Sequence, residues 1–155
     1  TIRSQYVHLI DVWPTIAQLI HVKMPGYVNG YKQQPVEGVS FAASLNDPAA
    51  KDSHTLQYYE TGASRALYFN GWKVEAYHPL GNYYLNDVWE LYDMKHDFNE
   101  HFNLAAKYPG KVRQMRALFD LEAKKYHVYP LHDSWFPEAE YLRISDSRLP
   151  QANNE

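Results

Sequence analysis

Cysteine is absent from this 155-residue sequence. The chain therefore forms no disulfide bond, offers no thiolate ligand to a metal ion and contains no cysteine nucleophile. An excess of positive charge is missing too, since 15 Lys and Arg stand against 18 Asp and Glu for a net charge of -3. Because nucleic acids and anionic membranes attract basic surfaces, we expect no nucleic acid and no membrane among the partners of this chain.

Long apolar runs are missing as well. No segment approaches the roughly 20 apolar residues that a membrane-spanning helix needs, and no charged start followed by an apolar stretch marks a signal peptide. The compartment in which the protein works stays open on this evidence. Aromatic residues, by contrast, make up 15% of the sequence, including 14 Tyr and 4 Trp. Such a composition favours strands in which the polar edge of a ring stays in contact with water.

The firmest structural signals lie between residues 54 and 131. Period-two patterns predict strands over residues 55–60, 65–69, 72–78 and 88–94. Asn70-Gly71 is the strongest short signal for a hairpin, since a type I′ turn needs positive φ at both central residues. Pro109 suits the first turn of a helix over residues 109–126 with one apolar stripe. We therefore predict an α+β fold, in which a four-stranded antiparallel sheet is covered by a C-terminal amphipathic helix.

The flanking segments complete a division of the chain into four parts. An apolar period predicts a helix over residues 7–20, which lies in the first part of the chain, residues 1–22. Residues 23–53 are rich in turn signals and predict an irregular connecting loop. Residues 54–131 form the sheet subdomain, and residues 132–155 an extended tail. In that tail Trp135, Phe136, Tyr141 and Leu142 are candidates to anchor a strap onto the body.

Several short motifs occur in order along the chain: HTLQYYE (54–60), RALY (65–68), GWK (71–73), WELYD (89–93) and NLA (103–105). The motif VHLIDVWPTI over residues 7–16 precedes them. Together they resemble the C-terminal part of bacterial arylsulfatases, which are sulfatases of the alkaline phosphatase superfamily. The resemblance implies that residues 1–22 are the last helix of the large sulfatase domain. The chain starts at Thr1 and enters an apolar periodic segment within a few residues, so we expect it to be cut from a longer sulfatase. The resemblance is broken at residues 61–64, where relatives have a different turn.

This resemblance implies that the complete protein hydrolyses sulfate esters, using a formylglycine nucleophile and a calcium ion. The family makes formylglycine from a C/S-x-P-S/A-R motif, which this chain lacks. We therefore expect no catalytic residue, no metal ligand and no cofactor within this chain, and no activity from it alone. The expected partners are the remainder of the sulfatase and a sulfate ester substrate.

Five residues near the predicted strand ends and hairpin loops are candidates for the rim of a substrate site, a place that loops commonly supply. They are Arg65, His78, His54, Glu60 and Lys73. For Arg65 and Glu60 the structural alternative is an ion pair across the hairpin, and for the histidines it is an ordinary core or surface position. His96 and His101 flank an acidic turn and are a weaker metal candidate than a solvated loop.

Two classes of function remain open. The first is a sulfuric ester hydrolase of which this chain is the C-terminal part, with a phosphate or phosphonate ester hydrolase of the same superfamily as a variant. The second is a free-standing, non-catalytic binding or assembly module.

Overall fold

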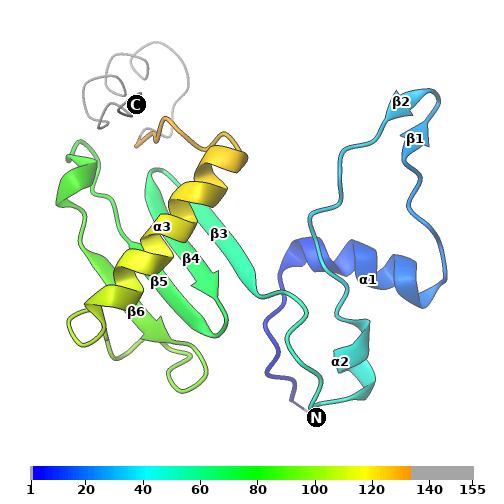
Figure 1. Cartoon of the computed structure of the whole chain (residues 1–155), viewed down its shortest axis with the longest axis horizontal. Coiled ribbons are helices and arrows are strands. Elements are labelled where there is room, and N and C mark those ends of the chain that lie inside the picture. Colours follow the sequence, from blue (N-terminus) through cyan, green and yellow to red (C-terminus); the bar gives the residue numbers. More distant parts are fainter. Residues whose placement is uncertain (1, 134–155) are drawn as a thin grey trace. The chain divides into compact units, whose positions relative to one another are not determined.

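The computed structural model describes residues 2–133, and the chain divides into two compact units between Thr55 and Leu56. The second unit is an antiparallel sheet with the strand order β3-β4-β5-β6. Its elements are β3 (Leu56–Thr61), β4 (Ser64–Phe69), β5 (Trp72–Ala76), the short helix η2 (Tyr84–Asn86), β6 (Trp89–Asp93) and helix α3 (Pro109–Lys125). Helix α3 lies across one face of the sheet (Figure 1). The predicted fold class is thus confirmed, with strand ends shifted by one or two residues.

The core of this unit forms where the apolar stripe of α3 meets one face of the sheet. Leu67, Val74 and Leu91 occupy one row of the strand register and are fully buried. Met115 and Phe119 of α3 pack against that row. The rings of Tyr58 and Trp89 meet Phe119 edge-on at centroid distances of 6.4 and 6.1 Å. The predicted helical stripe is therefore the covering layer of the sheet.

Both hairpin turns in the sheet use positive φ angles. Asn70 and Gly71 have φ values of 48° and 84°, which confirms the turn predicted between β4 and β5. Between β3 and β4, Gly62 and Ala63 have φ values of 52° and 64°. The left-handed region costs an alanine roughly 1–2 kcal/mol. A hydrogen bond from the backbone N–H of Ala63 to Oε1 of Glu60, 2.8 Å long, helps to hold this turn.

The first unit holds η1 (Leu9–Asp11), α1 (Val12–Leu19), α2 (Ala42–Asn46) and a small hairpin of β1 (Tyr27–Val28) and β2 (Tyr31–Lys32). The prediction of one helix over residues 7–20 was wrong at its start. There the His8 ring caps a 3-10 turn, in which the Asp11 carboxylate accepts a hydrogen bond from the His8 N–H at 2.8 Å. The expected irregular loop over residues 23–53 also contains regular structure, since the β1–β2 hairpin turns at Asn29-Gly30 with positive φ at both residues.

No helix within residues 2–133 combines the length and the apolar character that a membrane crossing requires. The predicted four-part division of the chain stays a prediction. The strap expected from Trp135, Phe136, Tyr141 and Leu142 lies outside the described residues.

Candidate functional site

The sheet register brings His78 and Asp87 together at one end of the sheet. Strands β5 and β6 end their pairing at Ala76 and Trp89, and His78 and Asp87 lie two residues beyond that pair, one on each side. Nδ1 of His78 lies 2.9 Å from both carboxylate oxygens of Asp87. Both side chains are fully buried. This contact closes the ends of the β5–β6 connection, residues 77–88.

Arg65 reaches the same carboxylate from strand β4. Its Nη2 donates to Oδ2 of Asp87, and its side chain is 9% exposed. The guanidinium lies over the rings of Trp89 and Tyr84, at 5.1 and 5.9 Å from the ring centroids. Burial lowers the pKa of Arg65 below its usual value, and the negative charge of Asp87 opposes that effect. Asp87 is therefore the shared anion of a buried cation and a histidine ring.

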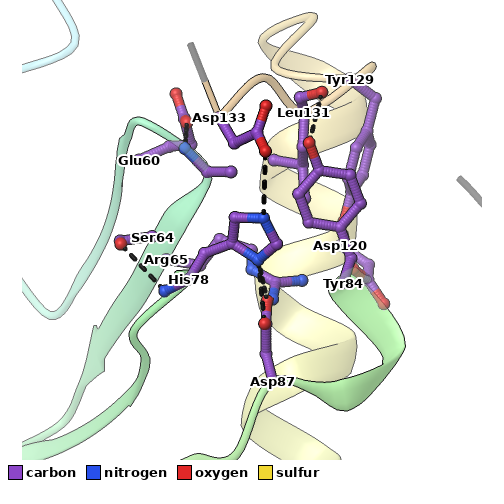
Figure 2. Close-up of polar contacts among 11 residues, drawn as sticks. Glu60, Ser64, Arg65, His78, Tyr84, Asp87, Asp120, Tyr129, Leu131 and Asp133 are labelled. Atoms are coloured by element: carbon purple, nitrogen blue, oxygen red, sulfur yellow. Dashed lines mark hydrogen bonds and ion pairs between the residues drawn. The ribbon is translucent and has the colours of Figure 1, made fainter. Parts of the chain in front are cut away.

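The other side of the His78 ring faces the segment that follows α3. Nε2 of His78 lies 3.8 Å from Oδ2 of Asp133, and Figure 2 shows the ring between Asp133 and Asp87. Oδ2 of Asp133 also accepts a hydrogen bond from the Gly81 N–H at 2.7 Å. The Tyr84 hydroxyl donates to the carbonyl of Leu131 at 3.1 Å. The β5–β6 connection is thus bound to residues 131–133 at two points.

Arg65, His78 and Asp87 form the buried site, and their geometry suits positioning. Nδ1 of His78 has its bonds to Asp87, and the backbone N–H of His78 donates to the Ser64 hydroxyl at 3.1 Å. A carboxylate with two partners holds each of them in one orientation. The contacts of Asp87 with Arg65 and His78 therefore fix the β5–β6 connection in place. The site is closed by residues 131–133.

Glu60 and Arg65 are register partners on neighbouring strands, yet the ion pair that forms is the one between Arg65 and Asp87. The Glu60 carboxylate instead accepts the backbone N–H of Ala63 in the β3–β4 turn. The cross-strand ion pair considered from the sequence is therefore replaced by a pair with a residue of the β5–β6 connection.

His54 and Lys73 bond to other carboxylates than that of Asp87. Nδ1 of His54 lies 2.7 and 2.8 Å from the two oxygens of Asp11, a fully buried carboxylate of the first unit. Burial acts to raise the pKa of Asp11, but hydrogen bonds from the N–H groups of His8 and Val39 and from His54 outweigh it and lower the pKa. The structure thus gives His54 a bonding partner within its own unit.

Lys73 lies on the sheet face opposite α3, because its neighbours Trp72 and Val74 point into the core and successive side chains of a strand alternate between faces. Its ammonium group lies 2.6 Å from Glu75 and 2.7 Å from Glu100. Burial acts to lower the pKa of Lys73, but the hydrogen bonds to Glu100 and Glu75 outweigh it and raise the pKa. Of the five predicted rim residues, only Arg65 and His78 share a partner, the Asp87 carboxylate.

Sequence reasoning missed Asp87, Asp133, Tyr84 and Asp11 as members of these sites. The strand register carried a signal for Asp87, since the residue opposite His78 follows from the β5–β6 pairing. In residues 2–133 no group of three or more His, Cys, Asp and Glu side chains is placed to hold a metal ion. His96 instead bonds Asp93 at the protein surface, with its Nδ1 2.9 Å from Oδ2.

No model of a protein family matches the chain. Arylsulfatase K of Xenopus laevis, a curated protein, is 25% identical over 137 residues, and the match covers 81% of this chain. This chain resembles the C-terminal portion of a sulfatase. The match covers 25% of that relative, so this chain spans about a quarter of its length.

Solved structures share the fold of this sulfatase-like chain. One, a sulfatase described with glycosaminoglycan metabolism by Bacteroides thetaiotaomicron, is 17% identical with a TM-score of 0.51 and covers 74% of this chain and 24% of that one. A second, in complex with its substrate D-glucosamine-2-N,6-O-disulfate, is 23% identical with a TM-score of 0.51 and coverages of 81% and 25%. A third, Ps i-CgsB, is 18% identical with a TM-score of 0.56 and coverages of 91% and 28%. The sulfatase-like fold thus extends over most of the chain.

Proposed function

We propose that this chain is the C-terminal part of a sulfuric ester hydrolase, in which it completes the fold. The observation that carries the proposal is the match to arylsulfatase K, which extends over both units of the chain at 25% identity. The fold that most of the chain shares with solved structures supports it. In this proposal the nucleophile and the calcium ion belong to the remainder of the enzyme, and the chain alone is inactive.

Helix α1 supports the proposal that the remainder of the sulfatase is a direct partner. Its apolar side chains Trp13, Ile16 and Leu19 are 50%, 43% and 50% exposed. Such a row on one short helix is unusual for an isolated unit, because exposed apolar patches mark interaction sites. We propose that this face packs on the large catalytic domain.

For the substrate rim we propose an indirect role of Arg65 and His78. Because both are buried against Asp87, they hold the β5–β6 connection in place, and that connection with the β3–β4 turn then faces the substrate. Glu60 lies near the end of β3, bonds the turn through Ala63 and stays a rim candidate, as do His54 and Lys73. The sulfate ester is the proposed substrate.

The experiment starts from the native protein that contains this chain. Its hydrolysis of an aryl sulfate with added calcium is measured beside hydrolysis of an aryl phosphate and an aryl phosphonate. Turnover of the sulfate supports the proposal, preference for a phosphorus ester favours the superfamily variant, and no turnover of any ester favours a binding module. Addition of the isolated chain alone to the same assays is expected to give no turnover.

The rim role is tested in the same complete enzyme with Arg65→Ala and His78→Ala, and with Lys124→Ala on the exposed face of α3 as the control. If the two residues position groups that act on the transition state, kcat and kcat/KM fall together. If they position groups that only bind the substrate, KM rises alone. Wild-type kinetics in both folded variants would remove the rim role.

A further inference from the structure

The first half of helix α3 and the loop before it concentrate positive charge in a chain whose net charge is -3. Residues 101–119 contain no Asp or Glu and four cations, which are Lys107, Lys111, Arg113 and Arg116. With +4 in this segment, the rest of the chain has a net charge of -7. Lys107, Arg113 and Arg116 are exposed, and Lys111 is partly exposed. These four residues are named the cationic surface below.

The cationic surface keeps its charge because no carboxylate of the described residues neutralises it. Lys73 shows the contrast, since its ammonium group lies 2.6 Å from Glu75 and 2.7 Å from Glu100. Within residues 2–133, no member of the cationic surface forms an ion pair. The first turn of α3 also has no acidic residue, although the positive end of a helix favours one there. Lys111 in that turn opposes the helix dipole, so the stability of α3 does not account for its charge.

Aromatic rings hold three of the four cations in place. The pairs, with distances to the ring centroids, are Lys107 over Tyr108 at 5.2 Å, Lys111 over Trp72 at 4.3 Å and Arg116 over Trp89 at 5.1 Å. A ring attracts a cation through its quadrupole but carries no net charge. The cations are therefore ordered and still available to an anion, and an anion that binds them loses little energy to ordering these side chains.

We propose that the cationic surface binds a chain of sulfated sugars, the polymeric form of the substrate proposed above. This inference rests on the proposed function, because it takes the anion from the sulfate ester that the complete enzyme hydrolyses. From Lys111 to Arg116 the helix rises by about 7.5 Å, so the surface meets several sulfate groups of one polymer. A polymer held there keeps its other sulfate esters at a high effective concentration near the enzyme.

A nucleic acid fits the cationic surface less well than a sulfated sugar chain. Proteins that bind single strands stack the bases on open aromatic faces. The rings of Trp72 and Trp89 instead pack against the core and lie under the cations of Lys111 and Arg116. The surface therefore offers charge without stacking platforms, which suits a polymer that is recognised by its anionic groups.

The test measures binding of the complete enzyme to dextran sulfate over a series of salt concentrations, with uncharged dextran of the same length beside it. Lys111→Gln with Arg116→Gln removes two charges from the cationic surface. We expect this double variant to bind dextran sulfate roughly tenfold more weakly, or weaker still, at fixed salt. The dependence of log affinity on log salt should become shallower by about one for each cation removed. Uncharged dextran should bind neither enzyme.

Lys124→Gln with Lys125→Gln is the matched control, since it removes the same charge from the last turn of α3. It should keep most of the affinity. Lys107→Gln with Arg113→Gln is a second test pair, in case the loss of the contacts with Trp72 and Trp89 unfolds α3. It should weaken binding as the first pair does.

Equal losses of affinity in the test pairs and the control pair would overturn the proposal, because net charge would then govern binding. Tighter binding to polyglutamate or to DNA than to dextran sulfate would also overturn it. Turnover of an aryl sulfate by the same enzyme tests the proposed function separately. Turnover without binding through the cationic surface would remove this inference alone, and binding through that surface without turnover would remove the proposed function alone.

Discussion

Replacing Asp87 by alanine should destabilise the second unit strongly, because it removes the shared partner of Arg65 and His78. The Arg65 side chain is only 9% exposed, so the substitution leaves a buried cation without its anion. Such losses cost about 3–5 kcal/mol. The contacts of the guanidinium with the Trp89 and Tyr84 rings remain, and cation–π contacts of this kind are worth about 0.5–2 kcal/mol. We therefore expect a loss near the lower end, about 3 kcal/mol.

A double-mutant cycle separates two costs of Asp87→Ala: the cost of leaving the Arg65 cation without its anion and the cost of the lost packing. Arg65→Met removes the cation and keeps an apolar stem of similar length. The double variant Asp87→Ala with Arg65→Met should be destabilised less than the sum of the two single variants, with a coupling of about 2 kcal/mol. Urea denaturation followed by circular dichroism gives the four free energies of unfolding. Costs that simply add, or a loss below about 1 kcal/mol for Asp87→Ala, would refute the view of Asp87 as the shared buried anion.

Two further predictions concern the core and the first unit. Phe119→Ala should lower the free energy of unfolding by about 3–5 kcal/mol, because the ring is fully buried between the sheet and α3. Lys124→Ala, on the exposed face of α3, should change it by no more than about 0.5 kcal/mol. Equal urea midpoints for the two variants would contradict the core assignment. The pKa of Asp11 is lower in the folded chain than its ordinary value of 3.8, so the stability that its charge provides is present above that value and is lost as the pH falls through the lower, folded-state pKa. Asp11→Asn should abolish this part of the acid destabilisation in a pH series of thermal midpoints, and an unchanged acid slope would show that another group causes it.

Much of the second unit could be predicted from the sequence because its signals are local. Asn70-Gly71 can adopt the two positive φ angles of its turn, and it therefore places β4 beside β5. Pro109 and the apolar spacing of α3 define a helix that has one face to bury. These features depend on neighbouring residues, so periodicity and turn chemistry suffice to find them.

The site was harder to predict because its members meet through tertiary contacts. Arg65 is opposite Glu60 in the register, which made their ion pair the natural expectation. The Arg65 guanidinium instead pairs with Asp87, whose position depends on how the β5–β6 connection folds back. Asp133 lies beside His78 because α3 crosses the sheet and brings the residues that follow it to this end. The start of α1 was misjudged for a local reason, since a His8 cap with a 3-10 turn competes with a regular helical turn.

The proposal that this chain works as the C-terminal part of a sulfuric ester hydrolase is tested most directly by the size and the activity of the native protein. An antibody against the chain is used to isolate the protein, its intact mass is determined, and its turnover of an aryl sulfate with calcium is measured. We expect a polypeptide well above the 18.1 kDa of this chain, with sulfatase activity that the antibody removes from solution. A native product of 18.1 kDa without turnover would contradict it.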